Sequence, residues 1–166
     1  MKAQGAADRL REFQTTGSRD RLLAYVDASG RDREHFERAW AGLEPVLRPL
    51  GHGFQPAVGQ LDVEALEAVA EPTAEILEWL ADSPKADLRE AAFRLMGALG
   101  RDRFLPRLAL ALSSPAAWER SAAVAALATQ GTVRARALLA RALDDPDAAV
   151  ATAARRALAR PQEASE

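Results

Sequence analysis

Residues 83–100 read SPKADLREAAFRLMGALG, and the same arrangement returns 31 residues later as SPAAWERSAAVAALATQG and then again as DPDAAVATAARRALARP. The copies begin at residues 83, 114 and 145, and each has a proline in second place and a pair of alanines in register. A fixed period of this order is typical of repeat architectures, in which each unit buries its apolar face against its neighbours. The sequence therefore predicts a stack of repeated units.

Each unit has the pattern of a helix, a turn and a second helix. Apolar residues recur at helical spacing from Leu88 onward. Gly100 and Gly131 stand where the first helix should end in a left-handed cap. We expect the Ser or Asp that opens each unit to cap the helix and the proline to take its first position. Second helices are predicted at about 104–112 and 134–143.

The bulk composition favours a folded helical protein. The chain has 166 residues, of which 48% are hydrophobic and 28% charged, and it contains no cysteine. Alanine, leucine and arginine are abundant, and these residues enter helices at little cost. No apolar run approaches the roughly 20 residues of a membrane span, and the first residues lack the apolar core of a signal peptide. We therefore expect a cytoplasmic protein with no membrane association.

The repeats divide the chain unequally. Residues 73–160 carry the 31-residue period, whereas residues 1–72 are predicted to form a divergent helical cap and an irregular repeat. A Pro- and Gly-rich stretch at 44–58 predicts the end of a helix and an irregular loop. Residues 161–166 are predicted to be a disordered tail.

The repeat motif begins with an apolar residue that is followed by Arg. A pair of alanines starts three residues after the apolar residue, and a Leu and then a Gly come further along the chain. The motif resembles bacterial HEAT-like repeats, including the short form found in phycobilisome lyase subunits. The residues that carry the resemblance are Leu88, Arg89, Ala91, Ala92, Gly100, Arg120, Ala122, Ala123, Gly131, Val150, Ala153, Ala154 and Leu158. Glu119 departs from it, since the other repeats have an apolar residue there, and the adjacent Trp118 could take over that packing.

The resemblance implies an all-α fold, an α-solenoid (α/α superhelix) of about three to four antiparallel helix pairs. It also implies that the second helices line a concave groove. Such stacks serve many functions, so the resemblance implies little about activity.

Charge is segregated along the chain. Residues 1–83 have nine basic against fifteen acidic residues, whereas residues 84–160 have thirteen basic against seven acidic ones. Arg103 and Arg134 are equivalent in the repeat, so they should form a short ladder beside other arginines. Trp118 follows a Ser-Pro step at the start of a helix, where we expect it to be exposed. The predicted partner-binding residues are Arg103, Arg107, Arg134, Arg136, Arg141 and Trp118.

These features predict a non-catalytic scaffold that binds a protein or peptide, acidic in character, in its groove. No nucleophile motif, phosphate-binding loop or metal-ligand spacing is present, so we expect no catalytic residue, metal or cofactor. One alternative is a nucleic-acid-binding or base-repair protein, although the sequence pI is near 5.8. Another is a lyase- or chaperone-like subunit acting on a bound cofactor or chromophore. A third is salt-sensitive self-association, in which the acidic segment 62–82 meets the basic repeats of another copy.

Overall fold

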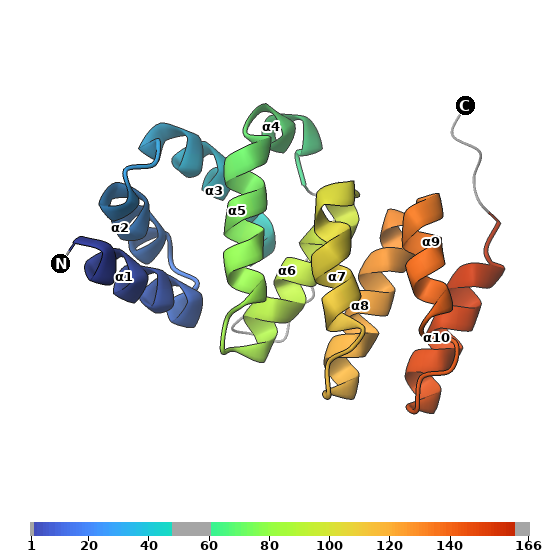
Figure 1. The fold of residues 1–166 in the computed structure, drawn as a ribbon. Coiled ribbons are helices and arrows are strands. Elements are labelled where there is room, and N and C mark those ends of the chain that lie inside the picture. The colour runs from blue at the N-terminus through green and yellow to red at the C-terminus, as the bar shows by residue number, and fades with distance from the viewer. Residues whose placement is uncertain (1, 48–60, 162–166) are drawn as a thin grey trace. The chain divides into compact units, whose positions relative to one another are not determined.

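The computed structural model describes residues 2–47 and 61–161, and all regular secondary structure within them is helical (Figure 1). The predicted all-α class is confirmed. The elements are α1 Lys2–Thr16, α2 Arg19–Ser29, α3 Arg33–Leu47, α4 Val63–Ala68, α5 Ala70–Ala81, α6 Ala86–Leu99, the 3-10 turn η3 Asp102–Phe104, α7 Leu105–Ala111, α8 Ala117–Gln130, α9 Val133–Ala140 and α10 Ala148–Ala159. Most of the loop predicted at 44–58 and of the tail predicted at 161–166 lies outside the described residues.

The turn that opens each repeat differs from the prediction. We expected the proline to be the first helical residue, but α6, α8 and α10 each begin two residues after it. Ser114 Oγ and Asp145 Oδ1 accept the backbone N–H two residues further on, at 3.2 and 2.9 Å. This bond closes a small turn that contains the proline. In α8 the residue before the helix, Ala116, is extended, so Pro115 lies outside the helix.

The glycines end the first helices as predicted. Gly100 and Gly131 both have φ of +64°, in the left-handed region that side chains disfavour. Their backbone N–H groups donate to the carbonyls of Met96 and Leu127, four residues earlier. The chain then reverses into the second helix of each pair, η3–α7 and α9.

The chain divides into two compact units, Met1–Ala92 and Phe93–Glu166. In the first, an aromatic cluster lies beside a mainly aliphatic core. The Trp79 ring stacks on Phe36 with centroids 5.6 Å apart and meets the Tyr25 ring edge-on at 4.9 Å. Trp40 meets Phe13 edge-on at 6.1 Å. Such pairs add to the stability that apolar burial provides.

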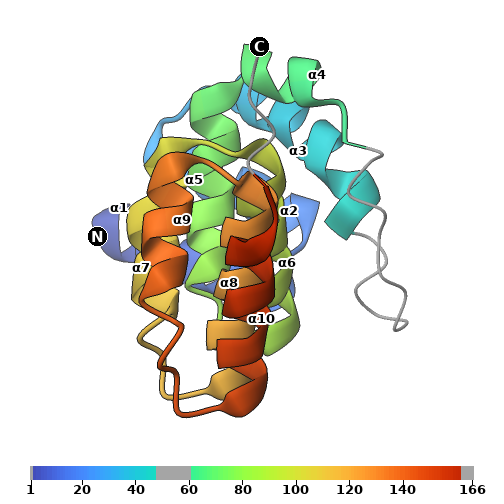
Figure 2. The same cartoon turned by 90° about the vertical axis from the view of Figure 1, so that its right-hand side faces the viewer.

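The second unit is built from two layers of helices. Figures 1 and 2 show α7 and α9 side by side in one layer and α8 and α10 in the other. Phe93, Phe104, Leu108 and Leu127 are fully or almost fully buried between the layers. Successive first helices approach closely. A Cβ added at Gly97 of α6 would lie 2.6 Å from the carbonyl oxygen of Ala126 in α8.

Among the described residues, no helix is both long enough and apolar enough to cross a membrane. The predicted boundary near residue 72 was drawn from the repeat in the sequence, and it stays a prediction.

Candidate partner-binding surface

Two of the predicted arginines lie in equivalent, exposed places. Arg103 is in η3 and Arg134 is in the first turn of α9. Arg134 Nη1 donates to Asp102 Oδ2 at 2.9 Å, an ion pair that joins neighbouring repeats. Both partners of this pair are largely exposed, so water and salt screen it and its net stabilisation is small. Arg134 and Asp102 therefore both remain in contact with water on this side of the unit.

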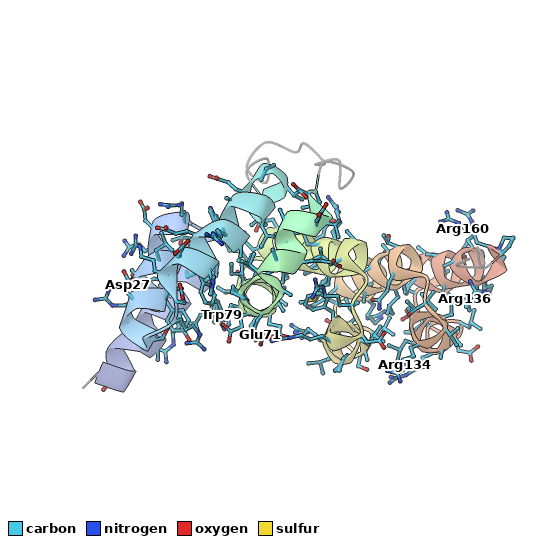
Figure 3. The ribbon with its side chains drawn as sticks, turned by 90° about the horizontal axis from the view of Figure 1, so that it is seen from above. Asp27, Glu71, Trp79, Arg134, Arg136 and Arg160 are labelled. Carbon is cyan, nitrogen blue, oxygen red and sulfur yellow. The ribbon has the colours of Figure 1, made fainter. Side chains whose placement is uncertain are left out.

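Two other arginines that were predicted to bind a partner instead contact neighbouring helices of the second unit. The Arg107 guanidinium lies 5.3 Å from the centroid of the Phe93 ring, in a cation–π contact. Arg136 donates to the carbonyls of Ala157, Leu158 and Arg160 at 3.3, 2.6 and 3.2 Å. These are among the last carbonyls of α10, which no intrahelical N–H can satisfy. Figure 3 shows Arg136 beside Arg160, whereas Arg134 lies on the outer side of α9.

Two aliphatic side chains that were not predicted from the sequence as binding residues are also exposed to solvent. Leu110 of α7 is 64% exposed and Val133 of α9 is 72% exposed. The repeat register holds a signal for both. Leu110 is equivalent to Arg141, and Val133 is equivalent to Asp102. A charged residue at the equivalent position of another repeat is thus a signal of exposure, but it is not a rule, because Leu105, the equivalent of Arg136, is buried.

The exposed positions form matching stripes on the two second helices. On each, two adjacent residues begin the stripe, and it continues at intervals of three and four residues, the spacing of a single helix face. We call this face the second-helix surface. Its residues are Asp102, Arg103, Pro106 and Leu110 on η3–α7, and Val133, Arg134 and Ala137 on α9 with Arg141 at its C-cap. It offers aliphatic side chains beside three arginines, one of which pairs with Asp102.

Trp118 lies apart from this surface. It is 39% exposed at the start of α8, so the predicted exposure is confirmed. However, α8 belongs to the other layer of the unit (Figure 2). Trp118 and the arginines of α7 and α9 therefore do not share one face.

A well-covered ion pair joins the turns of successive repeats. Arg120 Nε and Nη2 donate to the two carboxylate oxygens of Asp145 at 2.8 and 3.0 Å. The side chains are only 12% and 6% exposed. The hydrogen bonds from Arg120 hold the pKa of Asp145 below its usual range, although burial opposes this. The same pair raises the pKa of Arg120. This pair orients the repeats and is not accessible to a partner.

Residues 2–47 and 61–161 contain no group of three or more His, Cys, Asp or Glu side chains arranged to hold a metal ion. His35 is exposed, and its Nδ1 lies 3.5 Å from Asp32 Oδ2. His52 is outside the described residues.

A family model described as HEAT repeats matches residues 73–159, which is just over half of the chain. The chain belongs to the HEAT-repeat family. The matched region covers almost all of the three copies of the motif, and its helices α7–α10 pack as two layers within the second unit. The phycobilisome-lyase form of the repeat stays a prediction. No curated protein matches this HEAT-repeat chain.

Proposed function

We propose that this HEAT-repeat protein is a non-catalytic scaffold that binds a protein or peptide of acidic character through its second-helix surface. The observation that carries the proposal is the exposure of Leu110 and Val133, at 64% and 72%, on the same surface as Arg103, Arg134 and Arg141. Burying such side chains removes apolar area from water, which is the main driving force of association.

The charge of the second unit supports an acidic partner. Residues 93–166 contain eleven arginines against seven acidic residues. An excess of one sign raises the rate at which an oppositely charged partner is captured. Arginine is also enriched among the residues that dominate binding energy at interfaces, because its planar head group forms several hydrogen bonds at once.

The test uses capture from cell extract followed by binding to the purified partner. Bait proteins are the wild type, the double variant Arg134→Glu/Arg141→Glu and the double variant Leu110→Ser/Val133→Ser. The matched control is Arg155→Glu/Arg156→Glu, which makes the same charge change at exposed positions on α10. Neither control residue belongs to the second-helix surface.

We expect one protein to be captured by the wild type and the α10 control and lost by both surface variants. The purified partner should bind less tightly as salt rises, because exposed charges are screened. Equal capture by all four baits would refute the proposal. Capture of nucleic acid, with affinity falling steeply with salt, would instead support the nucleic-acid alternative.

A further inference from the structure

Exposed apolar side chains occur on two surfaces of opposite charge. Among the described residues, the large hydrophobic side chains that are exposed are Val63, Leu110, Trp118 and Val133. Leu110 and Val133 belong to the second-helix surface, which carries arginines. Val63 belongs to α4 in the first unit. A protein interface needs apolar area on both sides and complementary charge around it.

The helix α4 turns most of its residues outward. Its buried residue, Leu66, packs so closely on α3 that a Cβ added at Gly42 would lie 2.6 Å from Leu66 Cδ2. Asp62 accepts the backbone N–H of Ala65 at 3.0 Å and caps the helix. Leu66 and this cap hold the rest of α4 toward water. We call the exposed residues from 62 to 71 the α4 surface; they are Asp62, Val63, Glu64, Ala65, Glu67, Ala68 and Glu71.

The α4 surface combines acidic side chains with one large apolar side chain. Four of its seven residues are Asp or Glu, and residues 61–82 include no Lys or Arg. Val63 is 41% exposed, and the acidic Glu64 follows it. The α4 surface is therefore complementary to the second-helix surface in both charge and apolar content.

The second-helix surface has one end that matches this arrangement. Leu110 and Arg141 occupy equivalent positions of successive repeats, so they lie side by side on the neighbouring second helices. The pair of Asp102 with Arg134 is at the other end of the surface, about two helical turns away. Among the described residues, neither Arg141 nor Glu64 has an ion-pair partner. An aliphatic group beside a cation thus has its counterpart in Val63 and Glu64.

The charge balance of the two units favours a contact between copies. The first unit has eleven basic against seventeen acidic residues, whereas the second has eleven basic against seven acidic ones. Opposite charge raises the rate at which the first unit of one copy meets the second unit of another. Because both surfaces are on one chain, each is always present at the same concentration as its counterpart.

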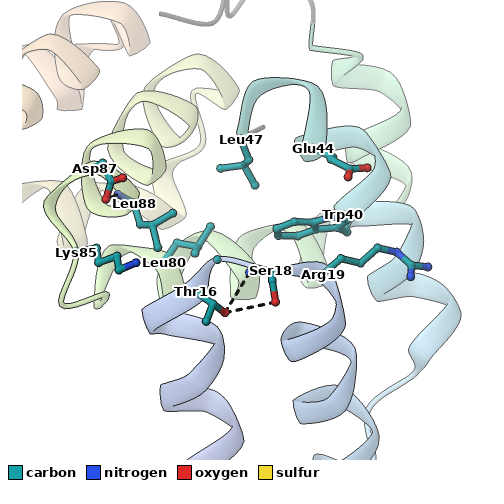
Figure 4. A pocket seen from close by; sticks show the side chains of 11 residues that line it. Thr16, Ser18, Arg19, Trp40, Glu44, Leu47, Leu80, Lys85, Asp87 and Leu88 are labelled. Atoms are coloured by element: carbon teal, nitrogen blue, oxygen red, sulfur yellow. Dashed lines mark hydrogen bonds between the residues drawn. The ribbon is translucent and has the colours of Figure 1, made fainter. Parts of the chain in front are cut away.

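The pocket of the first unit is not a comparable counterpart. It has a volume of about 390 Å³, and its walls come from the α1–α2 turn, α3, α5 and the start of α6 (Figure 4). Its charged residues are two cations, Arg19 and Lys85, and two carboxylates, Glu44 and Asp87. With both signs equally represented, the pocket gains no net attraction to a basic surface.

We propose that the second-helix surface binds the α4 surface of a second copy of this chain. Val63 packs against Leu110, and Glu64 pairs with Arg141. The contact is heterologous, because it joins two different surfaces. This inference rests on the proposed function, since it uses the same surface and names its acidic partner.

The first test is analytical ultracentrifugation of the full chain. A short helix buries little area, so we expect weak association, with a Kd on the order of 0.1 mM at low salt. Raising NaCl from about 50 to about 500 mM should increase this Kd at least about 5-fold, because the charges are screened.

Two matched variants locate the contact. Val63→Ser/Glu64→Lys changes the α4 surface, and Leu110→Ser/Arg141→Glu makes the mirror change on the second-helix surface. Each variant alone should associate about 10-fold more weakly or less. A 1:1 mixture of the two should associate again, because each variant supplies the surface that the other lacks. If two copies of one surface met instead, one of the variants would still associate like the wild type.

Controls make the same charge changes elsewhere. Asp20→Lys reverses a charge at an exposed position of α2, and Arg155→Glu/Arg156→Glu does so on α10. Both should associate like the wild type. Every substituted residue is exposed, so the fold should be kept, and circular dichroism checks it. If a double variant does not fold, Glu64→Lys and Arg141→Glu alone, and their mixture, replace it.

Three results would overturn the inference. One is a wild type that stays monomeric up to about 1 mM at low salt. Another is association that either double variant leaves unchanged, and the third is a mixture that does not associate. A monomeric wild type whose second-helix surface binds a different acidic protein would overturn the second copy but leave the proposed function standing.

Discussion

The contact between α6 and α8 leads to a test at Gly97. Alanine stabilises a helix interior by about 1 kcal/mol relative to glycine, so Gly97→Ala would be stabilising if the position were open. In the structure the new Cβ would lie 2.6 Å from the carbonyl oxygen of Ala126 and 2.7 Å from its Cα. Non-bonded carbon atoms prefer separations of about 3.5–4.0 Å. The two helices would therefore have to move apart by about 1 Å.

The net cost follows from these two effects. Overpacking a well-filled core typically costs about 1–3 kcal/mol, and the atoms in the way are backbone atoms that cannot rotate aside. We therefore place the cost at the upper end of that range. After the helix preference is subtracted, Gly97→Ala should lower the free energy of unfolding by about 1–2 kcal/mol.

Two other glycines provide matched controls. A Cβ at Gly5 in α1 would meet nothing within 4 Å, so Gly5→Ala should be neutral or stabilise by up to about 1 kcal/mol. At Gly42 in α3 the nearest atom, 2.6 Å away, is Cδ2 of Leu66, a side-chain end that can rotate. Gly42→Ala should fall between the other two. Urea unfolding followed by circular dichroism at 222 nm measures all three. A Gly97→Ala protein as stable as the wild type would refute the close approach of α6 and α8.

Three further predictions concern the charged residues of the second unit. Arg134→Ala should change the free energy of unfolding by no more than about 0.5 kcal/mol in urea titrations, because its pair with Asp102 is exposed. Arg136→Lys keeps the charge but loses the several hydrogen bonds that the guanidinium donates to carbonyls at the end of α10. Amide hydrogen exchange in the last turn of α10 should therefore become faster. The same substitution at the exposed Arg155 is the control and should leave that exchange unaltered. The pKa of Asp145 is lowered on folding, so its pair with Arg120 contributes stability above the unfolded pKa of about 4 and loses it as the pH falls through the folded pKa. In urea titrations between pH 2 and 7, Asp145→Asn should be less stable than the wild type near neutrality and should show a shallower loss below about pH 4; parallel curves would contradict this assignment.

The repeat architecture could be read from the chain because its signals are local. The period, the helical spacing of the apolar residues and the glycine caps all depend on residues within one or two turns of each other. Gly100 and Gly131 are the clearest case, since a left-handed φ at a helix end is a backbone requirement that glycine meets most easily. The turn at each proline was assigned less well. Helix capping and the small turn observed here both use a Ser or Asp oxygen, so the residue types do not distinguish them.

The roles of the arginines depended on tertiary structure. Arg134 and Arg136 are only two positions apart, yet one is on the exposed face of α9 and the other caps α10. Arg103 and Arg107 differ too, because Arg107 reaches the ring of Phe93 and is half-buried, whereas Arg103 is exposed in η3. The composition indicates that arginines are abundant, and the repeat register indicates which of them are equivalent. Only the packing of neighbouring helices decides which of their head groups meet protein and which meet water.

The pocket shows the same division more strongly. Its walls come from segments as far apart in sequence as Thr16, Trp40 and Leu88. No motif connects these residues, and each has an ordinary explanation in its own helix. The sequence alone determines where the helices and turns form here, because their formation depends on short-range preferences of the backbone. Which side chains meet around a cavity is set by how those elements pack, because packing brings together residues that sequence separates.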